Sequence, residues 1–232
     1  MRPAQDHHWQ MPPDRGKALM LAQRALSELV CDAVNLEGIP FTLPEIQTLL
    51  DGVSVGGHRL SDQQVALNQA AAWRFLFASL KADQFSLEPA FACQLHALAA
   101  KEEALSWGSF RQGSVTIAGS AYLPPPADQL ERLYQQLIDE LAGIDDIYDR
   151  AIKLFLQMAR IQFFYDVNKR MGRFMMNGIL LSAGYPAINL PARRQLEFNQ
   201  LMLDFYASNN EAPMNRFMRD CLDPRLIRIM QE

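Results

Sequence analysis

Several features are scarce in this sequence, and each scarcity excludes a class of protein. The three cysteines, Cys31, Cys93 and Cys221, lie far apart without ligand spacing, so we expect neither a disulfide framework nor a zinc site. No run of 18 apolar residues occurs, and the first residues contain no apolar stretch. We therefore expect no signal peptide, no spanning helix and no membrane partner, in a chain that resides in the reducing cytoplasm.

Basic charge is also in short supply. Lys and Arg together number 22 against 26 acidic residues, a formal net charge of −4. A protein that coats nucleic acid is usually strongly basic. We expect no nucleic-acid partner, and any phosphate site must be local.

What is present is helical periodicity over most of 232 residues that are 49% hydrophobic, enough for one sizeable core. We predict a flexible tail over 1–16, containing His7 and His8, and a single all-α domain over 17–232. Apolar residues at three- and four-residue steps predict the helices, which we place at 17–38, 42–50, 61–80, 86–101, 128–141, 149–163, 169–184, 192–208 and 212–222.

Local signals fix some helix ends. Gly38 is placed to end the first helix in a left-handed cap. Thr42 with Glu45, and Ser61 with Gln64, have the spacing of capping boxes at the starts of two helices. The segment 113–125, GSVTIAGSAYLPP, alternates apolar and small polar residues before prolines, which predicts a short β-hairpin.

The stretch RIQFFYDVNKRMGR, residues 160–173, links two predicted helices. The free N–H groups of a helix start can hold an anion, and Arg170 and Arg173 add positive charge. Asp166 could hold Mg²⁺ against the same phosphates. The alternative is that Asp166 and Asn168 only cap the helix while the basic residues are solvated.

This stretch resembles the signature of the Fic family, H-x-F-x-[DE]-G-N-G-R-x-x-R. In that register Asp166 matches the metal-holding acid, Asn168 the asparagine, and Arg170 and Arg173 the two arginines; Gly172 follows the usual continuation. The resemblance implies a Fic-type helical core whose loop over 162–173 binds ATP and Mg²⁺ and transfers AMP to a Ser, Thr or Tyr hydroxyl of a target protein.

The loop departs from this signature at three positions. Gln162 stands where the family has its general-base histidine, and a glutamine accepts no proton near neutral pH. Val167 and Lys169 replace the two glycines that let backbone N–H groups approach a pyrophosphate. The run DVNKR is similar to the Doc branch, in which the lysine is associated with phosphoryl transfer. Of the histidines, we expect His96 to be a core or surface residue.

Two further segments resemble regulatory and substrate-aligning parts of the family. CDAVNLEG is similar to its inhibitory motif, whose glutamate pairs with the second arginine, so the first helix is interpreted as an inhibitory helix in which Glu37, followed by Gly38, contacts Arg173. The alternative is that Glu37 is an ordinary surface acid ahead of a helix-ending glycine. The predicted hairpin resembles the family's flap, in which Val115, Thr116 and Ile117 either pair an incoming target strand or only cover the core.

Three functions follow from these observations. The first is a catalytically impaired relative of protein AMP-transferases with a degenerate nucleotide-binding loop. The second is a Doc-like protein kinase, and the third is a non-catalytic interaction scaffold, a pseudoenzyme. The target protein stays unidentified, and an oligomer is possible.

Overall fold

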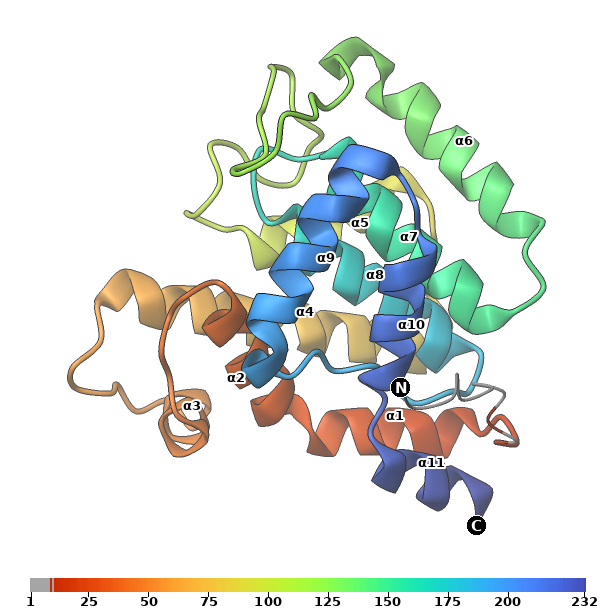
Figure 1. Cartoon of the computed structure of the whole chain (residues 1–232). Helices are drawn as coiled ribbons and strands as arrows, with labels where there is room; N and C mark the ends of the chain where they lie inside the picture. Colours follow the sequence, from red (N-terminus) through yellow and green to blue (C-terminus); the bar gives the residue numbers. More distant parts are fainter. Residues whose placement is uncertain (1–8, 10) are drawn as a thin grey trace.

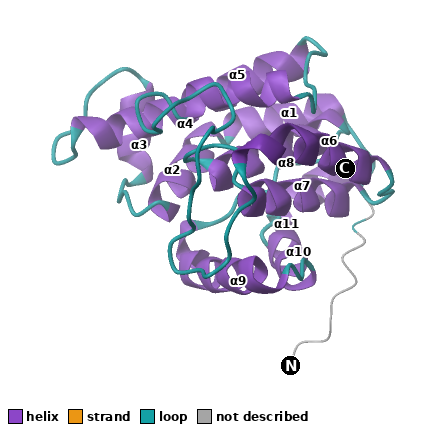
Figure 2. Ribbon diagram, turned by 90° about the horizontal axis from the view of Figure 1, so that it is seen from above, coloured by secondary structure: helices purple, strands orange, loops and turns teal. Residues whose placement is uncertain are grey.

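The computed structural model describes residue 9 and residues 11–232, and in this part of the chain every regular element is helical (Figures 1 and 2). The all-α prediction is confirmed. The α-helices are α1 (Arg15–Arg24), α2 (Leu26–Leu36), α3 (Leu43–Leu50), α4 (Leu60–Lys81), α5 (Pro89–Ala99), α6 (Leu130–Ala142), α7 (Ile147–Ile161), α8 (Asn168–Ser182), α9 (Gln195–Ser208), α10 (Ala212–Asp220) and α11 (Pro224–Gln231), with short 3₁₀ turns η1 (Ala127–Gln129) and η2 (Ala192–Arg194).

Helix α8 forms the centre of the core, and nearly all of its residues are buried. It packs most extensively against α7, and α4 and α5 cover it from the other side. A Cβ atom on Gly172 would lie 2.8 Å from the carbonyl oxygen of Phe155 on α7, so only glycine allows the two helices to approach this closely. The α7–α8 pair therefore forms a rigid support for the loop between them.

The predicted first helix is divided in two. Asp14 caps α1 by accepting a hydrogen bond from Lys17 N–H at 2.8 Å. The helix is interrupted at Ala25, and α2 begins at the next residue. Gly38 has φ +81°, which confirms the left-handed cap. Most of the predicted 1–16 tail, with His7 and His8, lies outside the described residues, but α1 begins within that range at Arg15.

Two other helix ends test the capping predictions. The capping box of Thr42 and Glu45 is present at the start of α3. The capping box predicted for Ser61 and Gln64 is wrong, because α4 begins at Leu60 and no side chain caps its start. The C-terminal helix α11 was not predicted, although Asp223 caps its start by accepting a hydrogen bond from Arg225 N–H.

The predicted β-hairpin at 113–125 is wrong, since the structure describes no strand there. The segment forms a long loop, yellow-green to green in Figure 1, with one backbone turn, in which Ser120 N–H donates to the Ile117 carbonyl at 3.1 Å. Pro124, Pro125 and Pro126 have no N–H to donate to a strand ladder. Alternation alone therefore does not produce a hairpin here.

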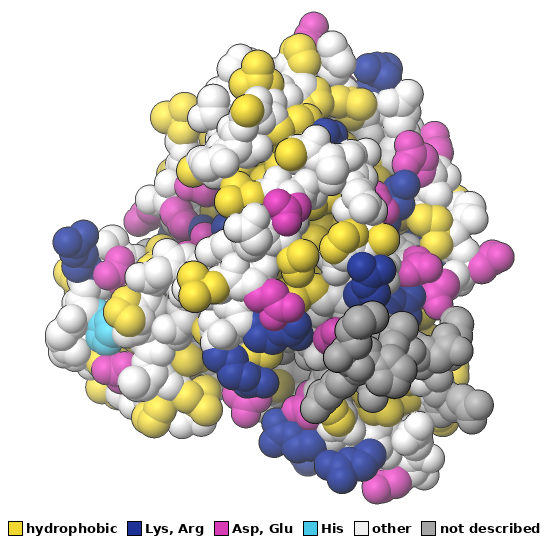
Figure 3. Space-filling view, viewed as in Figure 1, with side chains coloured by type: hydrophobic (Ala, Val, Ile, Leu, Met, Phe, Trp, Pro, Cys, Tyr) yellow, Lys and Arg dark blue, Asp and Glu magenta, His cyan; other side chains and the backbone are white. Residues whose placement is uncertain are grey.

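The surface carries mixed charge. On the face seen in Figure 3, Lys and Arg side chains are interspersed with Asp and Glu side chains. Among the described residues, no helix is both long and apolar enough to cross a lipid bilayer.

Candidate functional site

The loop between α7 and α8 has left-handed backbone at both ends. Gln162, with φ 57°, ends α7, and Val167, with φ 65°, precedes the first residue of α8. This conformation is unfavourable for a β-branched residue and costs on the order of 1–3 kcal/mol. Val167 is also buried, so packing holds the strained backbone in place.

Asn168 fixes the shape of the loop through its side chain. Its Oδ1 accepts from Phe164 N–H at 2.9 Å, and its Nδ2 donates to the Phe164 carbonyl at 2.8 Å and to Gln162 Oε1 at 3.0 Å. Gln162 Nε2 in turn donates to the Ala159 carbonyl at 2.5 Å. Both amide side chains therefore serve as structural ties, and Gln162 presents no basic atom.

A cavity of about 460 Å³ opens at the start of α8. No side chain caps this helix, so its first backbone N–H groups lack intrahelical partners. The cavity is lined by residues of the loop, of the 113–125 segment, of α9 and by Glu37: Glu37, Thr116, Ile117, Ala118, Gln162, Asp166, Val167, Asn168, Lys169, Asn199, Met202, Leu203 and Tyr206.

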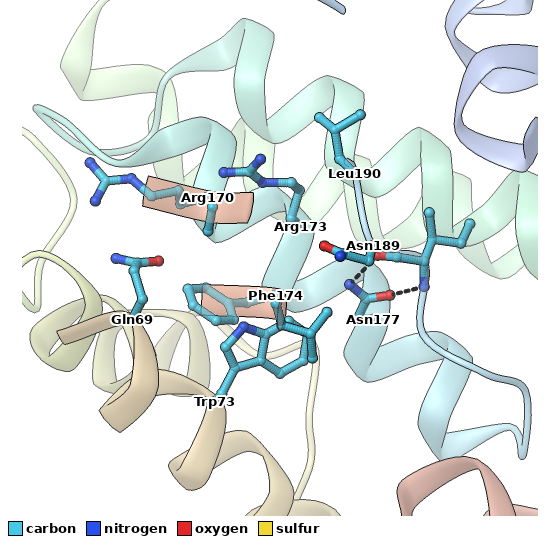
Figure 4. Close-up of a pocket in the computed structure, with 11 residues that line it drawn as sticks. Gln69, Trp73, Arg170, Arg173, Phe174, Asn177, Asn189 and Leu190 are labelled. Atoms are coloured by element: carbon cyan, nitrogen blue, oxygen red, sulfur yellow. Dashed lines mark hydrogen bonds between the residues drawn. The ribbon is translucent and has the colours of Figure 1, made fainter. Parts of the chain in front are cut away.

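Arg170 and Arg173 lie behind this cavity rather than along its wall. They border a separate space of about 20 Å³ together with Gln69, Trp73 and Phe174 (Figure 4). The guanidinium of Arg170 is buried and is held by both carboxylate oxygens of Glu103, with Nη1 to Oε2 at 2.9 Å. Arg170 is therefore already paired.

Glu37 lies between the cavity and the two arginines. Its Oε1 is 3.7 Å from Arg173 Nη2 and 3.7 Å from Arg170 Nε. The predicted contact with Arg173 is present, but as an ion pair shared with Arg170 and longer than a hydrogen bond. Arg170 Nε and Arg173 Nη2 have no hydrogen-bond partner, so both nitrogens retain donor capacity.

The charge state of this cluster follows from its surroundings. Burial opposes ionisation of Glu37, but Arg170, Lys169 and Arg173 together outweigh it and lower the pKa of this carboxyl group. Burial lowers the pKa of Arg173 to about 10. At neutral pH Glu37 is therefore an anion and Arg173 a cation.

Asp166 is exposed at the cavity, and its Oδ1 accepts from Val167 N–H at 2.6 Å. Within the described residues no group of three His, Cys, Asp or Glu side chains could hold a metal ion. A single carboxylate suits Mg²⁺ only when substrate phosphates supply further oxygen ligands. Gly172, by contrast, faces α7 and not the cavity.

His96 is a core residue, as expected, but its partners are polar as well as apolar. Its ring stacks on Phe164 with centroids 3.8 Å apart, Nδ1 accepts from Gly108 N–H at 3.1 Å, and Nε2 lies 3.3 Å from the Asp166 carbonyl. Burial, reinforced by the charge of Arg170, lowers the pKa of His96 to about 4 despite the hydrogen bond to Asp166. Neutral His96 therefore supports the loop through its contacts with Phe164 and the Asp166 carbonyl.

This histidine predicts a pH dependence of folding stability. Its pKa is about 4 when folded against 6.5 ordinarily, so its contribution is complete above pH 6.5 and is lost as the pH falls toward 4. The shift amounts to about 3 kcal/mol in total, of which about 2 kcal/mol is lost by pH 5. We expect His96→Gln, which can keep both hydrogen bonds, to lose about 2 kcal/mol less than wild type between pH 7.5 and pH 5.

Urea unfolding at both pH values measures this difference. His58 lies away from the loop, with its Nε2 3.2 Å from Glu45 Oε1. His58→Gln is therefore the matched control. Equal losses in wild type and His96→Gln would contradict a buried neutral imidazole.

Sequence reasoning missed Glu103, the partner of Arg170, and the α9 residues that complete the cavity. Glu103 is 67 residues from Arg170, and its neighbour Glu102 is an exposed acid of the same type. Nothing local distinguishes the two. For α9, the apolar residues Met202 and Leu203 fit an ordinary amphipathic helix.

Residues 86–180 match the model of the Fic/DOC family. "Protein adenylyltransferase Fic" of Drosophila willistoni is 24% identical over 221 residues, which cover 92% of this chain and 43% of that protein. Its counterpart in Drosophila melanogaster is 24% identical over 210 residues, with coverages of 88% and 42%. The chain thus spans less than half the length of these curated relatives.

Solved structures give the same fold. A Fic domain containing signaling protein from Bacteroides thetaiotaomicron has a TM-score of 0.77 at 19% identity, covering 94% of this chain and 89% of that one. Fic-1 from C. elegans has a TM-score of 0.73 at 18% identity, with coverages of 94% and 71%. Residues 86–180 thus match the Fic/DOC family model, and the chain has the fold of Fic-domain proteins.

Proposed function

We propose that this protein binds Mg-ATP in the 460 Å³ cavity and is a catalytically impaired relative of protein AMP-transferases. The observation that carries the proposal is the cavity itself, which lies at the uncapped start of α8 beside Asp166 and Lys169. A helix start with free N–H groups and adjacent positive charge favours phosphate. The proposal also places the protein in the cytoplasm, supported by three unpaired cysteines.

In this proposal each loop residue has a defined part. The N–H groups at the start of α8 and the Lys169 ammonium bind phosphate oxygens, and Asp166 holds Mg²⁺, which neutralises phosphate charge when bound. Thr116 and Ile117 line the cavity wall, where a Ser, Thr or Tyr hydroxyl of a target protein would approach. Gln162 cannot remove the proton of that hydroxyl, so transfer is slow.

Phosphoryl transfer is the second candidate, because Lys169 lines the same cavity. Loose transition states depend mainly on positioning and charge, so the missing base would matter less. Label moved from the α-phosphate of ATP reports AMP transfer, and label moved from the γ-phosphate reports phosphorylation. Transfer of neither label, without ATP binding, is the result expected of a scaffold.

Glu37 should restrain nucleotide binding, since it lines the cavity and its Oε1 lies 3.7 Å from Arg173 Nη2. We expect Glu37→Gly to bind Mg-ATP about tenfold more tightly than wild type, because a charge-assisted hydrogen bond contributes about 1.5–3 kcal/mol. Arg173→Ala in the Glu37→Gly background should remove that gain. Calorimetric titration at fixed ionic strength measures all three dissociation constants.

Glu28→Gln is the charge control, because Glu28 lies on α2, the helix whose C-cap is Glu37, but is exposed. It should bind like wild type. Equal affinity of Glu37→Gly and wild type would remove the restraining role of Glu37. Absence of binding at millimolar Mg-ATP in both would contradict the proposed nucleotide site.

A further inference from the structure

Arg111 is a buried arginine that the site described above does not use. Its side chain is only 2% exposed. The Nε–H donates to the Gln162 carbonyl at 2.6 Å, Nη1 to the Gly113 carbonyl at 2.7 Å, and Nη2 to the Pro125 carbonyl at 2.6 Å. A longer bond of 3.4 Å reaches the Ile161 carbonyl.

These acceptors belong to two separate parts of the chain. The carbonyls of Ile161 and Gln162 are the C-terminal end of α7, where unpaired carbonyls and the helix dipole favour a cation. Gly113 and Pro125 are the two ends of the 113–125 segment. One guanidinium therefore joins both ends of this segment to the end of α7.

The main chain adds a further link, because Arg111 N–H donates to the Phe163 carbonyl at 2.9 Å. The 113–125 segment has no strand ladder of its own among the described residues, and its single backbone turn lies at Ile117–Ser120. Arg160 contributes only a cation–π contact, 3.8 Å above the Tyr122 ring. The Arg111 bonds are thus the main polar restraint on the segment.

The two parts joined by Arg111 both line one cavity. Thr116 and Ile117 come from the segment, Gln162 comes from the end of α7, and all three line the 460 Å³ cavity. Arg111 itself does not line it. Any change in the Arg111 bonds would alter the spacing of these walls without touching a ligand.

We propose that Arg111 is a positioning residue, which sets the place of the 113–125 segment relative to residue 162. The effect of Arg111 on the position of the segment follows from the geometry alone. Its effect on transfer rests on the proposed function. Lysine cannot reproduce the role, since a single ammonium lacks the planar fork of donors that reaches carbonyls on several sides. A misplacement of about 1 Å at a reacting group can cost up to about 10²-fold in rate.

Backbone order parameters from ¹⁵N relaxation test the structural part in the full chain. In wild type we expect values near 0.85 at Val115–Ile117, as in rigid backbone, and values below about 0.6 in Arg111→Lys. Arg150 is the matched control, because its Nε and Nη2 both donate to the Ile144 carbonyl away from the cavity. Arg150→Lys should leave Val115–Ile117 unchanged.

Two results would overturn the inference. One is an unchanged order parameter at Val115–Ile117 in Arg111→Lys. The other is a value below about 0.6 in wild type, which decides the matter even where Arg111→Lys does not fold.

A rate measurement tests the consequence for transfer. In a Glu37→Gly, Gln162→His background, Arg111→Lys should lower AMP transfer about tenfold while the dissociation constant of Mg-ATP stays unchanged. An unchanged rate would contradict the positioning role in transfer. An inactive background counts against the proposed function alone, since the order parameters do not depend on nucleotide.

Discussion

In the Glu37→Gly background, Gln162→His should raise the rate of AMP transfer about 10²- to 10³-fold. General-base catalysis contributes typically 10²–10⁴-fold, and residue 162 already lines the cavity next to Asp166 and Asn168. The left-handed backbone at this position, φ 57°, is one that histidine adopts more readily than most residues. The substitution therefore adds an imidazole without requiring a new loop conformation.

The assay is transfer of label from the α-phosphate of ATP to the protein itself and to an extract of cellular proteins. Gln162→Asn in the same Glu37→Gly background is the control, because asparagine also tolerates left-handed backbone but has no basic nitrogen. The Gln162→Asn protein should transfer label at the same rate as the Glu37→Gly protein that keeps Gln162. If Gln162→His binds Mg-ATP but transfers label no faster than Gln162→Asn, the missing base is not what limits this protein.

Helices were predictable from the sequence because their information is local. Apolar spacing marks α7 and α8, and the capping box of Thr42 and Glu45 marks the start of α3. The 113–125 segment was mispredicted because its conformation depends on distant partners. Arg111 binds both ends of the segment and the end of α7, 51 residues away along the chain, and no local pattern encodes that contact.

In the candidate site, too, contiguous motifs were predictable and contacts between distant residues were not. The loop residues and the Glu37 contact followed from a resemblance between contiguous motifs, and the structure brings Glu37 within 3.7 Å of Arg173. Glu103 and His96 act on the loop from 67 and 70 residues away. Each has an ordinary local setting, so only the tertiary fold distinguishes it from neighbouring residues of the same type.

Loss of Glu103 should be the most destabilising single change at this site. Arg170 is 3% exposed, and Glu103 is its only hydrogen-bonded partner among the described residues. Removing one member of a buried ion pair leaves an uncompensated charge and costs about 3–5 kcal/mol. Glu37, 3.7 Å from Arg170 Nε, compensates part of that charge, so for Glu103→Ala we expect a loss of about 3 kcal/mol.

Thermal and urea unfolding measure this loss, which corresponds to a fall in Tm of about 6–12 °C in a chain of this size. Glu102→Ala is the matched control, since Glu102 is exposed and lies 3.9 Å from Lys101. Its cost should stay within about 0.5 kcal/mol. A similarly small cost for Glu103→Ala would contradict a buried pair.

A double variant separates the lost contact from the orphaned charge. Replacing a buried ion pair by apolar side chains of similar volume is often neutral or stabilising. Arg170→Met with Glu103→Leu should therefore recover most of the stability that Glu103→Ala loses. If it does, the role of Glu103 is to allow a charged Arg170 to remain buried beside Arg173, where Glu37 can contact both arginines at once. If the double variant is as unstable as Glu103→Ala, the hydrogen bonds themselves stabilise the fold and Arg170 cannot be replaced there by an apolar residue.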